Sequence, residues 1–181
     1  MSNNAENIRS SLWKDGAFVS DEWVSLAAGE SPVRNEKVFV AFADALALLE
    51  DGASLPSSLG VIVGADDDVN DLAPYLDHIE AVAIDFPGFG DGRGFSSSRL
   101  LRERHGFKGE IRAVGNYILD QMPLLVRCGV SSFLVTSEKV KAGLLRGEWP
   151  EVTTYYQPVA GDGETPAGQL RPWLRHNAKA G

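Results

Sequence analysis

Short apolar runs alternate with longer amphipathic stretches along most of the chain. The first run is KVFVAF, which begins at residue 37, and it is followed by ADALALLEDG, rich in alanine and leucine and ending at Gly52. Apolar strands of about five residues separated by helices of about ten are typical of βαβ units in a parallel sheet covered on both faces. Further strands are predicted at 59–64, 81–86, 110–115, 132–136 and 152–156, with helices at 67–77, 96–106, 120–128 and 137–146.

The number of strands limits the possible architectures. A complete (β/α)8 barrel takes about 250 residues and eight strands, more than this chain of 181 residues offers. We therefore expect an α/β fold with about six mainly parallel strands and crossover helices, either as an open sheet or as a partial TIM-barrel-like structure.

The two ends of the chain show different patterns. In the first 36 residues, short apolar pieces are broken by Asp15-Gly16, Gly29 and Pro32, which indicates hairpins and turns. Beyond Pro158 the chain is rich in glycine and proline, apart from the apolar pair Trp173-Leu174. We predict an N-terminal β arm at 1–36, an α/β domain at 37–158 and a mobile C-terminal tail at 159–181.

Composition favours a soluble, cytoplasmic globular protein. Apolar residues make up 44% and charged residues 23% of the chain, and no stretch approaches the roughly 20 apolar residues that span a bilayer. The N-terminus lacks the apolar core of a signal peptide. The net charge of −8 disfavours non-specific binding of nucleic acid, so an anion site must be local.

The loops that follow the strands are the natural place for a ligand site. Ligands of parallel α/β sheets bind at the carboxyl ends of the strands, so the loops beginning at Gly64, Asp85, Gly115 and Thr136 should open on one edge. The longest of them lies within FPGFGDGRGFSSSRLLRERHGFKGE, residues 86–110, and places glycine at four alternate positions before an arginine-rich helix.

Two common phosphate-binding motifs do not match this loop. The dinucleotide fingerprint G-x-G-x-x-G/A would require glycine or alanine where Phe95 stands, and no Walker A motif is present. A more general anion site remains: Arg93 supplies a guanidinium fork, Ser96 to Ser98 supply hydroxyls at a helix N-terminus, and the glycines let a ligand approach the backbone. The alternative is a flexible crossover loop with Ser96 as a plain helix cap.

Carboxylates and amides surround the same rim. Asp85 ends a buried strand, where a carboxylate needs a partner, so it either holds Arg93 in place or takes part in proton transfer. Asn116, Asp120 and Gln121 would face the rim from the next loop or act as caps; Asp120 as N-cap would place Pro123 in the first helical turn, where proline is tolerated.

Other common centres are not supported. DDDVND at 66–71 lacks the glycine of a calcium loop, so these acids are interpreted as helix caps and no metal is predicted. The three histidines show no metal or triad spacing, and no serine-hydrolase elbow occurs. Cys128, the only cysteine, excludes an internal disulfide and a C-x-x-C pair, and its position at a helix end predicts a raised pKa.

Residues 59–135 closely resemble the bacterial family called domain of unknown function 934. The resemblance rests on a motif of the form FPxFxDGRGxSxxRLLRxRxGFxGExRAVGDVxxDQxxxxxRCGF. Two departures occur: Asn116 stands where the family shows aspartate, and Val130-Ser131 replaces Phe-Asp. The motif falls on Phe86, Pro87, Asp91, Gly92, Arg93, Gly94, Ser96, Arg99, Glu110, Arg112, Gly115, Asp120, Gln121, Arg127 and Cys128.

The resemblance implies a pathway more than a mechanism. Members of the family are often labelled oxidoreductases of sulfite reduction, because they accompany enzymes of assimilatory sulfate and sulfite reduction. It implies a protein that binds a sulfur oxyanion, or a sulfated or phosphorylated metabolite, at the glycine-rich loop 86–98. The candidate catalytic residues are Asp91, Arg93 and Asp85; the candidate binding residues are Gly90, Gly92, Gly94, Ser96, Ser97, Arg99, Gly115, Asn116, Asp120 and Gln121.

Two other functions stay open. The protein could be a non-catalytic module that docks on sulfite reductase or a related reductase, which the absence of cysteine pairs and nucleotide fingerprints favours, together with the Trp173-Leu174 tail. It could also be an oxidoreductase with its own flavin or nicotinamide, although the sequence identifies no cofactor. Neither nucleic acid nor a membrane is an expected partner.

Overall fold

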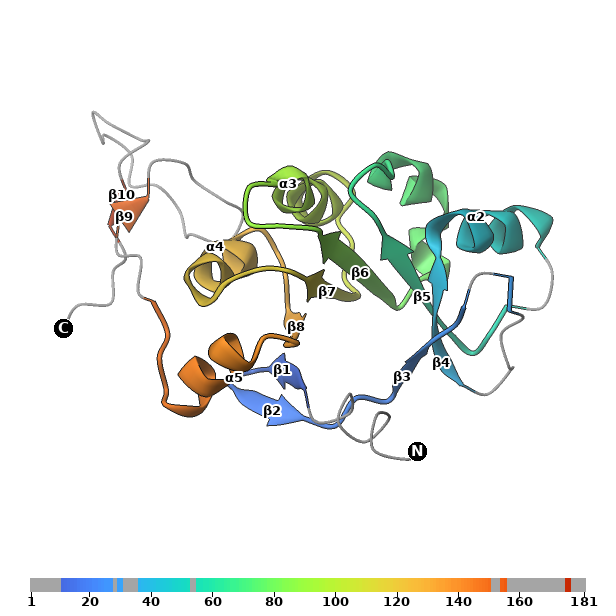
Figure 1. Ribbon diagram of the computed structural model, residues 1–181. Coiled ribbons are helices and arrows are strands. Elements are labelled where there is room, and N and C mark those ends of the chain that lie inside the picture. The colour runs from blue at the N-terminus through green and yellow to red at the C-terminus, as the bar shows by residue number, and fades with distance from the viewer. Residues whose placement is uncertain are drawn as a thin grey trace, which may run out of the picture.

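The computed structural model describes residues 11–27, 29–30, 36–52 and 55–150, together with the backbone of 154–155 and 175–176. Its centre is one curled sheet of eight strands in the order β2-β1-β8-β7-β6-β5-β4-β3 (Figure 1). The strands are β1 (Leu12–Lys14), β2 (Ala17–Val19), β3 (Trp23–Ser25), β4 (Lys37–Ala41), β5 (Ser58–Val63), β6 (Ala81–Phe86), β7 (Glu110–Gly115) and β8 (Ser132–Leu134).

Strands β3 to β8 run parallel and neighbour one another in chain order, as in a half-barrel. The hairpin β1–β2 adds two antiparallel strands beyond β8, with Leu12 opposite Leu134. Its tight turn is Asp15-Gly16, where both residues have positive φ, as a two-residue hairpin turn requires. The sheet is therefore mixed, and the α/β class with mainly parallel strands is confirmed.

Two strand predictions need correction. The expected sixth strand at 152–156 is not part of the large sheet: its central residues form β9 (Thr154–Tyr155), which pairs with β10 (Arg175–His176) in a separate ribbon. The sixth parallel strand is instead β3, from the predicted N-terminal arm. Trp23 fixes it there, because its ring packs on that of Phe39 with centroids 4.7 Å apart. Trp173-Leu174 and most of the predicted tail lie outside the described residues.

Helical segments follow each strand from β4 onward. They are α2 (Phe42–Asp51), the 3-10 segment η1 (Val69–His78), α3 (Arg93–Arg99) continued by the π-helical turn η2 (Leu100–Arg104), the 3-10 turn η3 (Leu119–Gln121), α4 (Met122–Arg127) and α5 (Glu138–Leu145). Pro123 lies in the first turn of α4, as predicted. Asp120 is not its N-cap, because η3 begins one residue earlier and Gln121 precedes α4.

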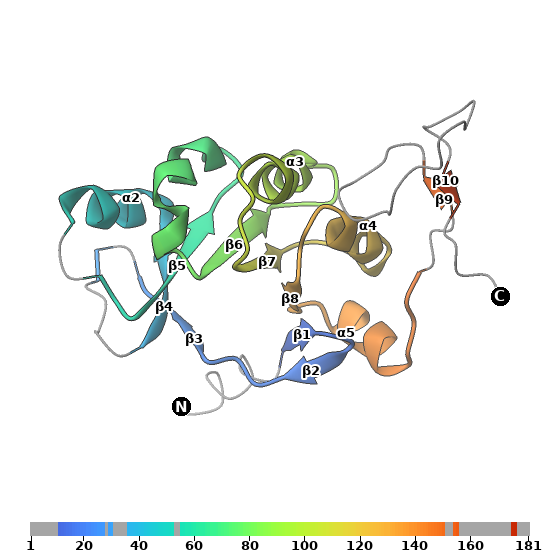
Figure 2. The same cartoon turned by 180° about the vertical axis from the view of Figure 1, so that it is seen from behind.

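The helices that the structure describes lie on one face of the sheet, so the prediction of helices on both faces is wrong. On the covered face, alternate strand residues such as Val61, Ile84 and Ile111 join helix residues such as Leu101 and Leu125 in one buried core. The opposite face is concave, and a small second cluster of Phe39, Ala81 and Ala83 lies on it. In the view from behind in Figure 2, the helices α2, α3 and α4 again lie on the same side of the sheet.

No helix within the described ranges is long and apolar enough to cross a membrane.

Candidate functional site

The glycine-rich loop runs from the end of β6 to the start of α3. A Cβ added to Gly88, Gly90 or Gly92 would meet no atom within 4 Å, and none of the three has a positive φ. Gly94 differs, since its Cβ would lie 2.6 Å from the Phe86 ring and 3.1 Å from Ile84. Close packing of α3 on β6 thus explains Gly94, while the other three leave an open stretch of backbone facing solvent.

The following loop holds this glycine loop in place. The backbone N–H of Asn116 donates to the Phe86 carbonyl at 2.6 Å, and its side-chain amide donates to the Pro87 carbonyl at 3.1 Å. Gln121 Nε2 donates to the carbonyl of Phe89 at 3.4 Å. The Phe89 side chain is 67% exposed at the tip. The predicted rim residues Asn116 and Gln121 therefore do meet the glycine loop, as supports of its backbone.

Arg93 is held between two carboxylates. Its Nε and Nη2 donate to Asp91 at 3.0 and 2.6 Å, and its Nη1 donates to Asp66 at 2.5 Å. The hydrogen bonds from Arg93 hold the pKa of Asp91 at about 2, below its usual 3.8. The same bonds from Asp91 and Asp66 raise the pKa of Arg93. The Asp66 side chain is 95% exposed, whereas that of Asp91 is 21% exposed.

The start of α3 differs from the prediction. Helix α3 begins at Arg93 rather than at Ser96, with Gly92 as its N-cap; the Asp91 carboxylate just before it accepts the backbone N–H of Arg93 at 3.0 Å and favours the positive end of the helix. The serines accordingly lie in the second turn and offer no first-turn N–H groups. Ser98 is buried and donates to the Gly94 carbonyl at 2.8 Å, and Ser97 is half-buried beside it.

Two further predicted residues lie on the outside of this helix. Ser96 and Arg99 border a shallow hollow of about 320 Å³, and Arg99 Nε donates to Glu103 at 2.8 Å. They share that surface with Leu100 and Arg104.

Asp85 does not pair with Arg93, so the first of its two predicted roles is wrong. Alternation along β6 explains why: Ile84 and Phe86 face the helical core, and Asp85 therefore faces the concave side. Its Oδ1 lies 2.5 Å from where a Cβ of Gly115 would stand, and Gly115 has φ +94°. Among the described residues no side chain or N–H donates to the Asp85 carboxylate. The predicted rim residue Asp120 is exposed to solvent.

A buried charge network on the concave face was missed by sequence reasoning. Arg112 donates to both oxygens of Asp21, at 2.7 and 3.1 Å, and through Nε to Glu110 at 2.9 Å. Glu110 also accepts from Lys14 at 3.1 Å and from the Ser132 hydroxyl at 2.7 Å. Burial opposes ionisation of Glu110, yet the bonds from Ser132, Arg112 and Lys14 leave its pKa below the usual value. The alternation of charged and apolar residues in EIRAV was the available signal.

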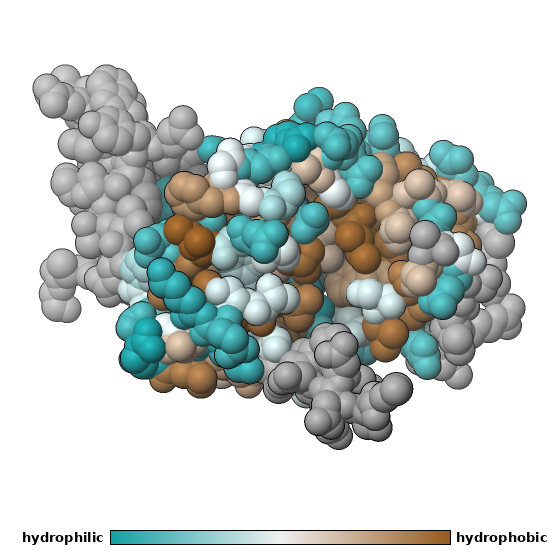
Figure 3. Space-filling model, in the orientation of Figure 1, coloured by the Kyte–Doolittle hydropathy of each residue, from teal (hydrophilic) through white to brown (hydrophobic). Residues whose placement is uncertain are grey.

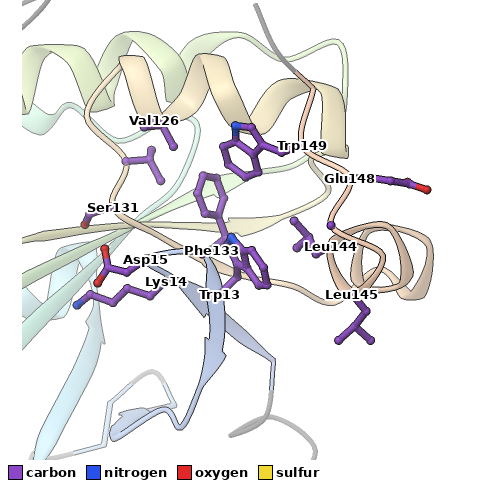
Figure 4. A pocket seen from close by; sticks show the side chains of 13 residues that line it. Trp13, Lys14, Asp15, Val126, Ser131, Phe133, Leu144, Leu145, Glu148 and Trp149 are labelled. Carbon is purple, nitrogen blue, oxygen red and sulfur yellow. The ribbon is translucent and has the colours of Figure 1, made fainter. Parts of the chain in front are cut away.

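A second surface hollow lies between β1, β8 and the helices α4 and α5. It has a volume of about 610 Å³ and is walled by aromatic and aliphatic side chains, among them Trp13, Phe133 and Leu144. Figure 4 shows the rings of Trp13, Phe133 and Trp149 gathered around it. Trp149 and Leu145 are 40% and 69% exposed at its edge.

Cys128 lies at the C-cap of α4, and burial raises the pKa of its thiol. Within the described part of the chain, no group of three or more His, Cys, Asp or Glu side chains is arranged to hold a metal ion.

The fold and rim define an α/β half-barrel protein with a polar carboxyl-end rim. A family described as bacterial protein of unknown function (DUF934) matches residues 60–167, and the chain belongs to that family. No curated protein matches the chain.

Proposed function

We propose that the protein binds a small oxyanion, or a sulfated or phosphorylated metabolite, at the carboxyl-end rim, with Arg93 as the anion anchor. The observation that carries this proposal is the unequal hold on Arg93. Asp91 accepts three hydrogen bonds from the Arg93 side chain and one from its backbone N–H, while among the described residues only the exposed Asp66 accepts from Nη1.

Asp66 occupies the position that an oxyanion would take. Ion pairs between exposed side chains contribute little stability, so a ligand with two or three acceptor oxygens can displace Asp66 from Nη1. Asp91 would remain in place and keep the guanidinium oriented. The three glycines that face open space would then let the ligand accept backbone N–H groups of the loop.

The sulfur chemistry comes from the family resemblance. It makes sulfite and sulfate the first anions to test, with phosphate as the comparison and adenylyl sulfate as a larger candidate. The identity of the bound anion would then decide between two roles, an oxidoreductase and an accessory factor of sulfite reduction. Asp85 lies next to Gly115 and has no hydrogen-bond partner in the described part of the chain, so it is then the candidate proton-transfer group.

The test is calorimetric titration of these anions at constant ionic strength. Wild type should bind one of them saturably, Arg93→Gln should abolish the binding, and Asp66→Asn should strengthen it several-fold by removing the competing carboxylate. Arg104→Gln is the matched control, since it removes the same charge from an exposed arginine of the following turn. Equal binding by wild type and Arg93→Gln would refute the proposal.

A second candidate function is docking on a reductase of sulfur assimilation. It is favoured by the aromatic hollow between α4 and α5, where exposed Trp149 and Leu145 adjoin buried Phe133. Trp149→Ala and Leu145→Ser should then abolish co-purification with sulfite reductase and leave anion binding intact. If wild type runs apart from the reductase at micromolar concentrations, this candidate fails.

A further inference from the structure

The concave face of the sheet holds a hollow that neither the rim nor the aromatic hollow includes. Its volume is about 510 Å³, within the usual range for small-molecule pockets. In Figure 3 the surface between the two ends of the curled sheet is hollowed, with hydrophobic residues along its wall. Its lining, called the concave pocket below, comprises Asp21, Trp23, Val24, Ser25, Phe39, Ile62, Ala83, Arg112, Val114 and Leu134.

The walls of the concave pocket suit a flat ring. Trp23 and Phe39 lie side by side over Gly60, where a Cβ would come within 3 Å of both rings. Ile62, Ala83 and Val114 continue the surface as aliphatic neighbours on the same face of adjacent strands. Aromatic and aliphatic side chains of this kind bind planar ring systems by stacking and dispersion.

The charged residues at the base of the concave pocket are paired with one another, so they do not favour a charged ligand. Arg112 is 3% exposed at its side chain, lies 5.0 Å from the Phe39 centroid and is bonded to Asp21 and Glu110. With Lys14 on Glu110, the two positive and two negative charges of the network balance. Among the described residues, an anion would find no cation here that is held only by an exposed carboxylate, as Arg93 Nη1 is by Asp66 at the rim.

Asp85 supplies the unpaired polar group next to the pocket. It is the register partner of Val114 and lies two residues past Ala83 on the same face of β6; Val114 and Ala83 line the pocket, and Asp85 stands just beyond this lining. Its carboxylate is half-buried and receives no hydrogen bond from the described residues. A carboxylate can accept two parallel N–H bonds from one ring edge.

We propose that the concave pocket binds a planar heteroaromatic ring whose edge carries adjacent N–H donors, as in guanine or a pterin. The ring face lies against the partly exposed Trp23, Ile62 and Val114, above the buried Phe39 and Ala83, and the N–H edge donates to Asp85. Both proposals give Asp85 a role, but this site does not use Arg93, so Arg93→Gln distinguishes the failure of one from the failure of the other.

The test compares three nucleosides by equilibrium dialysis. Guanosine presents two adjacent N–H groups, N1–H and the 2-amino group, whereas inosine has N1–H alone and adenosine has only its 6-amino group beside the acceptor N1, so wild type should bind guanosine more tightly than the other two. Asp85→Asn should weaken guanosine binding by about tenfold, in line with the loss of a charged acceptor. Asp77→Asn is the matched control on the exposed outer layer, and it should bind like wild type, as should Arg93→Gln.

A pocket-filling variant adds an independent check. Ala83→Leu places a larger side chain in the concave pocket and should abolish guanosine binding; if that variant does not fold, the Asp85→Asn comparison alone decides. No saturable binding of any nucleoside at millimolar concentration would overturn the proposal, and so would guanosine binding that is indifferent to Asp85→Asn. A wild-type dimer that Ala83→Leu converts to monomer would also overturn it, because the hollow would then be an interface between copies.

Discussion

The two oxygens of Asp21 meet the two terminal nitrogens of Arg112 at 2.7 and 3.1 Å, although the residues are 91 positions apart. Their side chains are 5% and 3% exposed. Asp21 lies between β2, at one edge of the sheet, and β3, at the other. The pair therefore fastens the segment that crosses the concave face to the middle of β7.

Removing one partner of this pair should be costly. Asp21→Asn leaves the Arg112 charge buried with less compensation, and we expect a loss of about 3–5 kcal/mol in the free energy of unfolding, measured by urea denaturation. Glu22→Gln is the neighbouring control: the Glu22–Lys37 pair is exposed, so the midpoint should hardly move. A loss below about 1 kcal/mol for Asp21→Asn would contradict a structural role for the pair.

The stability of the folded protein should fall at acid pH, in part because Glu110 becomes protonated. The pKa of Glu110 is lower in the folded protein than its usual 4.5, so folding favours the ionised form. Its contribution is complete above pH 4.5 and is lost as the pH falls through the lower, folded pKa. Thermal unfolding of Glu110→Gln should show a shallower loss of stability below pH 4.5 than wild type. Parallel curves would show that the carboxylate is not stabilised by its partners.

The pKa of Asp91 reports directly on the contact with Arg93. Carboxyl NMR titration should find a value of about 2 in wild type, and Arg93→Gln should return it toward 3.8, because the hydrogen bonds to the ionised form are lost. Arg104→Gln should leave the titration unchanged. An Asp91 pKa near 3.8 in wild type would mean that the contact does not persist in solution.

The glycines of the loop should respond differently to a methyl group. Gly94→Ala forces a Cβ against Phe86 and Ile84, and overpacking of this kind costs about 1–3 kcal/mol. Gly90→Ala meets no neighbour and should keep the melting temperature of wild type. Calorimetric melting of both variants checks this. Equal melting temperatures would show that α3 can move away from β6 without cost.

Local patterns predicted the parallel strands and the rim, because both depend on short-range sequence. The order of strands alone placed β6 in the sheet, and it placed Asn116 and Gln121 in the loop after β7, next to the glycine-rich loop. Asp85 was correctly placed at the end of β6 but wrongly paired, since the alternation of side chains turns it away from Arg93.

Long-range pairing could not be predicted in the same way. The contact of Asp21 with Arg112 depends on the curl of the sheet, which brings the arm across the concave face. The face without helices was missed because apolar residues on both sides of β6 predict two helical layers, whereas here Ala81 and Ala83 are buried in a small cluster with Phe39. The start of α3 was misplaced because the helix begins after Gly92, where the Asp91 carboxylate accepts the N–H of Arg93, and the serines therefore lie one turn inside it.

The antiparallel pairing of β1 with β8 has a consequence for synthesis on the ribosome. Leu12 and Trp13 emerge early, but the strand that they pair with, including Phe133 and Leu134, is made only near the end of the described domain. The hairpin must therefore wait, with its apolar residues unpaired, until almost all of the half-barrel exists. Contacts between such distant segments slow folding, so the first strand to be made is among the last to reach its place.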